Sequence, residues 1–211
     1  MSIERRRHFR ELSLQVLFFI DSVYPEILGK PKRIAVSSTS DDPNNSVEHS
    51  EPRSKLVRKG VRKRISKAAS QIDLHTNDAT DNNQPLTDDE RLIEGNRVLN
   101  DFWLNFKESS QEKNNFFLLL TQGVIQNIAA IDQKIEQFSS NWKIERMTCV
   151  DRNILRIAVF EIMYCSDIPY KVSINEAIDI GKNFGTNDSG SFVNGVLDSI
   201  RLSLGKDICK S

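Results

Sequence analysis

Aromatic residues are distributed very unevenly along this chain of 211 residues. All sixteen Phe, Trp and Tyr residues lie in residues 1–24 or 102–211, and the segment between has none. A segment without aromatic side chains buries little apolar surface, and residues 30–90 are also rich in polar and turn-forming residues. We therefore predict a disordered insertion at 30–90, which separates a first helical segment at 1–29 from the remainder of one folded domain at 91–211.

The formal net charge is zero, but the cations are clustered. One cluster lies in RRRHFRE at the N-terminus, and a second lies at 53–67 inside the predicted insertion, where we expect a solvated segment. Local clusters matter more than total charge for binding a polyanion. Cations in the first turn of a helix also oppose its macrodipole, at a cost of about 0.3–1 kcal/mol each. The N-terminal cluster therefore favours contact with RNA or DNA over a solvated helix start.

The sequence carries few signs of catalysis, of metal or cofactor binding, or of membrane insertion. His8 lies in the basic cluster, His49 and His75 lie in the predicted insertion, and no nucleotide-binding or zinc-protease motif occurs. The three cysteines are odd in number and widely spaced, so we expect reduced structural thiols and no zinc site. No apolar run approaches the roughly 20 residues of a membrane span. We expect a cytoplasmic, non-catalytic protein without metal or cofactor.

Hydrophobic residues recur at helical spacing outside the insertion, and no segment alternates as a β-strand does. The pattern predicts an all-α fold in which the strongly apolar segment before Pro169 forms a central helix. Ser173 and Glu176 match a capping box, which predicts a helix start there. Gly195 lies inside the last helix, where we expect close helix–helix approach. The remaining helices are expected at about 3–24, 92–106, 116–128 and 129–142.

The last helix begins in the unusual stretch FGTNDSGSF, at residues 184–192. Gly185 is expected to end the preceding helix, and Thr186 to Ser189 to cap the next one. Phe192 lies about 100° from Val193, at the margin of the buried stripe. An aromatic residue in that position is either part of the core edge or a platform for a ligand beside unpaired backbone N–H groups. The spacing leaves both interpretations open.

Two stretches carry a resemblance to a known family. They are RRRHFRELSLQVLF and VDRNILRIAVFEIMYCSDIPYKVSINEAIDIGKNFGTNDSGSFVNGVLDSI, and together they resemble the NusB family of transcription antitermination factors. The resemblance implies a fold of two packed helical subdomains with about seven helices and no enzymatic activity. It also implies binding of boxA RNA from ribosomal RNA transcripts, together with the ribosomal protein NusE, in an RNA polymerase antitermination complex with other Nus factors.

The resemblance also implies which side chains face RNA. The expected contacts lie in the first helix and at the start of the last one: Arg5, Arg6, Arg7, Arg10, Phe18, Asp188, Ser189 and Phe192. Two features depart from the family pattern. The insertion is far longer than the usual connection, and Gly190 and Ser191 replace a commonly basic pair.

Several alternatives stay open at this point. The Asp188 carboxylate is either a base-recognition group or a compensating charge at a helix N-terminus. The protein could act as an interaction module for NusE or another ribosomal partner with little RNA binding of its own. A third reading is the RNA-targeting appendage of a ribosomal RNA cytosine methyltransferase, which would require this chain to be a fragment.

Overall fold

The computed structural model describes residues 3–29, 85–105, 115–139 and 142–205. Most of the predicted insertion, including its basic cluster at 53–67, lies outside these residues, as does Cys209. The described segments contain helices and no β-strand, which confirms the predicted all-α class. The described residues form seven α-helices: α1 (Ile3–Val23), α3 (Asp88–Asn105), α4 (Asn115–Gln126), α5 (Ile128–Phe138), α6 (Cys149–Tyr164), α7 (Tyr170–Phe184) and α8 (Ser189–Ser203). They also form the 3-10 helices η1 (Pro25–Leu28) and η2 (Ile144–Arg146).

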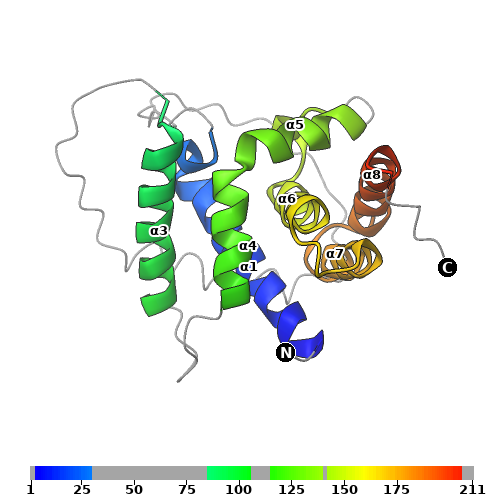
Figure 1. Cartoon of the computed structure of the whole chain (residues 1–211), viewed down its shortest axis with the longest axis horizontal. Coiled ribbons are helices and arrows are strands. Elements are labelled where there is room, and N and C mark those ends of the chain that lie inside the picture. The colour runs from blue at the N-terminus through cyan, green and yellow to red at the C-terminus, as the bar shows by residue number, and fades with distance from the viewer. Residues whose placement is uncertain (1–2, 30–84, 106–114, 140–141, 206–211) are drawn as a thin grey trace, which may run out of the picture.

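The helices form two packed groups, as predicted (Figure 1). In one group α1 packs against α3, α4 and η1, and in the other α5, α7 and α8 surround α6. Helix α6 also contacts α1 and α4, so it joins the two groups into one hydrophobic core. Every residue from Asp151 to Ile162 is buried, which agrees with a central helix that is apolar nearly all round.

The start of α3 shows a capping box that the sequence analysis missed. The Thr87 N–H donates to the Glu90 carboxylate at 2.8 Å, and the Glu90 N–H donates to the Thr87 hydroxyl at 3.3 Å. This reciprocal pair satisfies two backbone donors at the helix end, so α3 begins at Asp88, before the expected boundary at residue 91. The signal T-x-x-E was visible in the sequence, at the edge of a segment predicted to lack structure.

The capping box predicted at Ser173 and Glu176 is wrong. Helix α7 begins at Tyr170, directly after Pro169, whose backbone conformation favours a helix start. Ser173 therefore lies inside the helix, and its hydroxyl donates to Glu161 on α6 at 2.6 Å. Glu176 accepts hydrogen bonds from Arg7 on α1. Both side chains join helices together and do not cap the helix in which they lie.

Close approach of helices occurs at glycines, although not at the one expected. A Cβ built on Gly181 of α7 would lie 3.5–3.6 Å from backbone atoms of Ser189 and Gly190, so α7 and α8 nearly touch there. A Cβ on Gly123 of α4 would overlap the Phe160 ring of α6. Gly195 is exposed, and no described atom lies within 4 Å of its Cβ position. The expected helix contact at Gly195 is therefore wrong.

A buried ionic network connects α1, α5 and α6. The Asp21 carboxylate of α1 accepts from Arg152 at 2.6 Å and from Arg156 at 3.5 Å. Arg156 is fully buried and also donates to Asp132 of α5 at 2.6 and 2.8 Å. Because each buried charge has an opposite partner, three helices from distant parts of the chain are tied at one point.

Candidate nucleic-acid interface

The first part of the candidate interface is the arginine arm, which we define as Arg5, Arg6, Arg7 and Arg10 of α1. Arg5 is exposed and Arg6 is partly exposed. The Arg6 guanidinium lies 5.5 Å from the Phe116 ring centroid and 3.8 Å from the exposed Asp167 carboxylate. Stacking on a ring leaves part of the Arg6 guanidinium edge available, and Arg5 is exposed, so both retain surface for a phosphate.

Arg7 is engaged by acidic groups of α7. It donates to both oxygens of Glu176, at 2.9 and 2.6 Å, and to Asp179 at 2.9 Å. The hydrogen bonds to Glu176 and the charges of both carboxylates raise the pKa of Arg7, although burial acts in the opposite direction. Part of its side chain stays exposed, but two neighbouring negative charges offset its attraction for an anion.

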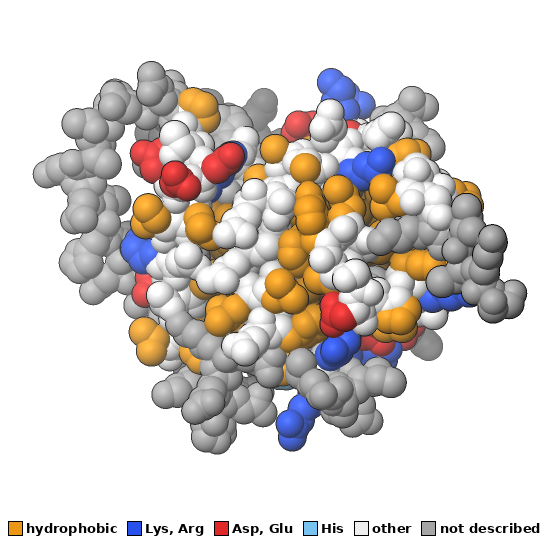
Figure 2. Space-filling view, in the orientation of Figure 1, with side chains coloured by type: hydrophobic (Ala, Val, Ile, Leu, Met, Phe, Trp, Pro, Cys, Tyr) orange, Lys and Arg blue, Asp and Glu red, His pale blue; other side chains and the backbone are white. Residues whose placement is uncertain are grey.

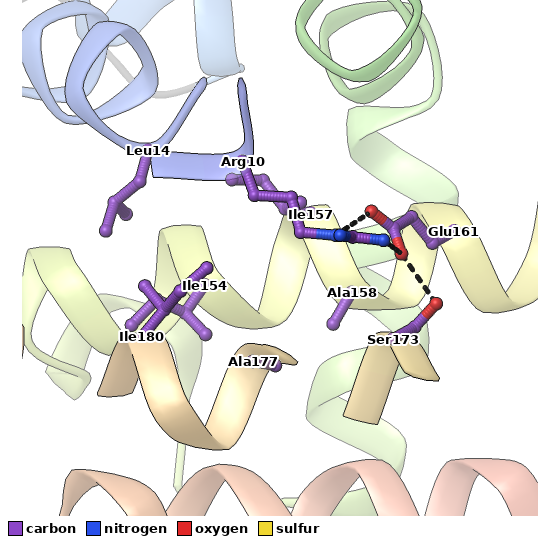
Figure 3. Close-up of a pocket in the computed structure, with 9 residues that line it drawn as sticks. All are labelled: Arg10, Leu14, Ile154, Ile157, Ala158, Glu161, Ser173, Ala177 and Ile180. Atoms are coloured by element: carbon purple, nitrogen blue, oxygen red, sulfur yellow. Dashed lines mark hydrogen bonds and ion pairs between the residues drawn. The ribbon is translucent and has the colours of Figure 1, made fainter. Parts of the chain in front are cut away.

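Arg10 requires a correction of the predicted interface. It is 3% exposed, and its guanidinium donates to the Glu161 carboxylate of α6 at 2.7 and 3.0 Å (Figure 3). Ser173 donates to the same carboxylate, and apolar side chains of α1, α6 and α7 line the space beside this ion pair. The Arg10 guanidinium thus has no free surface for a phosphate. We reassign Arg10 as the residue that fastens α1 to α6.

The second part is the α8 start, residues 185–192. Asp188 is the N-cap residue and is exposed, but its side chain makes no capping hydrogen bond. Ser189 is buried, and its hydroxyl accepts from the Thr186 N–H at 2.7 Å. A Cβ on Gly185 would lie 2.2 Å from that hydroxyl, so Gly185 is needed for space and does not adopt a left-handed conformation. Ser189 was predicted to contact RNA, but its buried hydroxyl holds this turn together instead.

Phe192 occupies the edge of the core, as its spacing predicted. It is half-buried, and its ring meets the Trp142 ring edge-on, with centroids 6.4 Å apart and an interplanar angle of 65°. Trp142 follows α5 and is 54% exposed. The sequence analysis placed Trp142 at the end of a helix and assigned it no function. An aromatic residue next to the polar run SSN was the available signal.

Different partners hold the two parts of the interface. The ion pairs of the arginine arm run to α6, to α7 and to the connection between them, whereas Phe192 contacts Trp142 beyond α5. Figure 1 shows α7 between the N-terminal end of α1 and α8. On α8 itself, Asp188 and Phe192 are four residues apart and share one face. Phe18 is half-buried against the core, so only part of its ring is available.

The departure at Gly190 has a structural explanation. Gly190 is buried, and a Cβ there would lie 3.0 Å from Cγ of Lys182 on α7. A larger residue would displace Lys182 from the helix contact. Ser191, in contrast, is exposed. Gly190 therefore permits the close packing of α7 on α8 and leaves no open space for a ligand.

The visible surface carries no extended block of positive charge among the described side chains. On the face shown in Figure 2, Lys and Arg lie dispersed toward the margins, and hydrophobic and uncharged side chains occupy the middle.

Burial raises the pKa of Cys149 and of Cys165 to about 11, so both thiols are protonated near neutral pH. Within 3–29, 85–105, 115–139 and 142–205, no cluster of metal-binding side chains is found, and no helix there has the length and apolarity to cross a membrane.

Comparison with known proteins places these features in a family. The NusB family model matches residues 59–201, which include α3 to α7, most of α8 and both Asp188 and Phe192. Transcription antitermination protein NusB of Desulfatibacillum aliphaticivorans is 60% identical over 92 residues, which are 44% of this chain and 64% of that protein. The protein of the same name from Desulforapulum autotrophicum is 53% identical over 102 residues, covering 48% of this chain and 71% of that one.

A solved structure of T. maritima NusB is also similar, with 34% sequence identity. The matched region covers 52% of this chain and 81% of the T. maritima chain, with a TM-score of 0.45. The chain thus spans slightly less than two thirds of the Desulfatibacillum protein and somewhat more of the other two relatives. Because the family model covers more than half of the residues, the chain belongs to the NusB family.

Proposed function

We propose that this protein is a non-catalytic transcription antitermination factor that binds boxA-type RNA of ribosomal RNA transcripts together with NusE. It would act in an RNA polymerase antitermination complex with other Nus factors. The observation that carries the proposal is the family match over 59–201, which includes the exposed Asp188 and the half-buried Phe192. The arginine arm precedes the matched range and adds cationic side chains.

Three kinds of contact follow from the side chains at the interface. Arg5 and Arg6 contact phosphates, since both retain exposed surface. The Phe192 ring stacks on a base, and aromatic stacking is tolerant of sequence. The Asp188 carboxylate accepts from a base amino group, which supplies selectivity because a carboxylate otherwise repels RNA.

Sequence-selective binding is tested by titrating boxA RNA and a scrambled RNA of equal length into the protein in the presence of NusE. We expect tighter binding of boxA RNA, with an affinity that falls as salt concentration rises. Equal affinities for the two RNAs would contradict the sequence selectivity.

Phe192→Ala should weaken boxA RNA binding by about 1–3 kcal/mol, the usual contribution of one stacked base. Helicity should change little, because Phe192 is only half-buried. Isothermal titration calorimetry gives the affinity and far-UV circular dichroism the helicity. Tyr24→Ala is a matched control, since Tyr24 is also a half-buried aromatic residue but lies after α1. An unfolded variant, or a folded one with normal RNA affinity, would make Phe192 a core residue only.

A second candidate function is a protein-interaction module with little RNA binding of its own. The observation that favours it is the engagement of Arg7 and Arg10 by carboxylates of α6 and α7. This candidate would be supported if the protein binds NusE but shows no detectable affinity for RNA, whether or not NusE is present.

Asp179→Asn tests whether the arginine arm lies near bound RNA. The change removes one negative charge beside Arg7 and leaves the Glu176 pair in place. A unit charge about 10 Å from a phosphate contributes about 0.4 kcal/mol in water, or about a twofold change in Kd. RNA affinity at low salt should therefore rise about twofold if the arm lies near RNA, and the gain should shrink at high salt. An unchanged Kd at low salt would place RNA away from the arm.

A further inference from the structure

The RNA contacts proposed above give no role to Gly195 or to Trp142. Gly195 lies in the middle of α8, where glycine destabilises a helix by about 1 kcal/mol relative to alanine. Its Cβ position faces open space, so no packing within the described structure requires a glycine. Trp142 exposes 54% of its surface, which is unusual for so large an apolar side chain. Trp142 contacts the Phe192 ring, and Gly195 lies three residues after Phe192 on the same helix.

We propose that Trp142, Phe192 and the bare helix surface at Gly195 form one nucleobase-binding platform, in which Trp142 is a second stacking residue. This inference rests on the proposed function, because it assumes that the chain binds RNA. It extends the interface from the α8 start to the turn that follows α5.

The helix geometry explains why a glycine at position 195 matters for Phe192. Residues three apart lie on the same face of a helix, and each side chain covers the turn that precedes its own Cα. A side chain longer than that of alanine at position 195 would therefore extend toward Phe192. The glycine leaves this side of the ring uncovered, so a planar group can approach both the ring and the helix backbone.

Trp142 lies on a turn that holds its backbone in place. Its N–H donates to the Ser139 carbonyl at 3.1 Å, and the Ser139 hydroxyl donates to the Trp142 carbonyl at 2.5 Å. The next residues form η2, in which the Ile144 N–H donates to Glu136 of α5 at 3.1 Å. Because the backbone is fixed, the indole loses little freedom when a ligand stacks on it.

The groups around the rings match a nucleotide better than an apolar partner. Asp188, four residues before Phe192, provides an exposed acceptor on the same face of α8. Ser191 is exposed and uncharged, and Lys143, directly after Trp142, is an exposed cation. A nucleotide presents a flat aromatic base with N–H donors and an anionic phosphate, so each of these groups has a counterpart on it.

Gly195→Leu is the most specific test, because it should weaken RNA binding without lowering the stability of the protein. The leucine should cover Phe192 and weaken boxA RNA binding, measured with NusE present, by about fivefold or more. The free energy of unfolding should stay equal or rise, since leucine favours helix and its Cβ meets no neighbour. The control is Asn194→Leu, which places the same side chain about 200° away from Phe192. Unchanged binding in Gly195→Leu, or an equal loss in both variants, overturns the proposal.

Trp142 can be observed directly by its fluorescence. Trp103 packs against Phe117 in the other helical group, so Trp103→Phe leaves Trp142 as the single tryptophan. Adding boxA RNA to the complex with NusE should quench Trp142, whereas a strand of the same length without bases should not. Trp142→Ala should raise the Kd about 5- to 150-fold, and Trp142→Phe should restore most of the affinity.

The outcomes separate this inference from the proposed function. Quenching by boxA and scrambled RNA alike would support the platform and contradict sequence selectivity. Selective boxA binding with constant Trp142 fluorescence and normal affinity of Trp142→Ala would overturn the platform alone. A fluorescence change produced by NusE in the absence of RNA, with none on later addition of RNA, would assign the platform to a protein partner and also overturn the proposal.

Discussion

Asp21→Ala should lower the free energy of unfolding by about 3–5 kcal/mol, the usual cost of removing one partner from a buried ion pair. Asp21 is 3% exposed and accepts from Arg152 at 2.6 Å and from Asn153 at 3.1 Å. Arg156 would keep Asp132, whereas Arg152 would keep only carbonyl acceptors, the nearest being that of Met147 at 3.1 Å. A buried cation without an anionic partner is the physical cause of the loss.

Chemical denaturation of the full chain measures this loss. Asp198→Ala is the matched control, because it removes an aspartate that pairs with Arg201 on the surface of α8. Exposed ion pairs contribute about 0–1 kcal/mol, so the control should unfold at nearly the same denaturant concentration. Similar losses in the two variants would show that burial of the Asp21 network does not determine its contribution.

Gly123→Ala should destabilise the protein by about 3 kcal/mol, at the upper end for an overpacked core. The added Cβ would lie 2.0 Å from Cζ of Phe160 and 2.3 Å from its Cε2. Phe160 is buried and stacks on Tyr164, with ring centroids 5.3 Å apart, so it has little room to move. Helices α4 and α6 must therefore separate, which opens the contact between the two helical groups.

The same substitution at Gly195 gives the opposite expectation. Gly195→Ala should raise the free energy of unfolding by about 0.5–1 kcal/mol, because alanine favours the helix and contacts nothing at that position. Thermal and denaturant unfolding of the two variants can be measured side by side. A loss of stability in both would indicate that helix propensity and steric space do not explain these glycines.

The helices were predictable because their signals are local. Apolar spacing placed α1 closely and predicted α6 as a central helix, and it placed Phe192 at the core edge where the structure has it. Helix ends were less well predicted. Pro169 and not Ser173 determines the start of α7, because Ser173 and Glu176 serve distant partners. The same S-x-x-E pattern supports a cap or a tertiary contact, and only the surrounding helices decide between them.

The candidate interface was harder to predict, because exposure depends on contacts between distant residues. Arg7 and Glu176 are 169 positions apart, and Arg10 and Glu161 are 151 apart. A run of arginines predicts an anion site when its charges are free, yet three of the four lie within 4 Å of a carboxylate. Nothing in the sequence assigned Trp142 to the interface; its contact with the Phe192 ring is visible only in the structure.

The sequence by itself determined the all-α class, the central apolar helix, the marginal position of Phe192 and the family resemblance, because each depends on short-range spacing or on motifs. The tertiary structure decided which arginines remain exposed, which glycines allow helices to meet, and that Trp142 adjoins Phe192. The physical reason is that burial and ion pairing depend on the packing of α1, α6, α7 and α8, which no single segment specifies. Gly195 illustrates the difference, since its neighbours along the chain suggested a helix contact and the fold left it open.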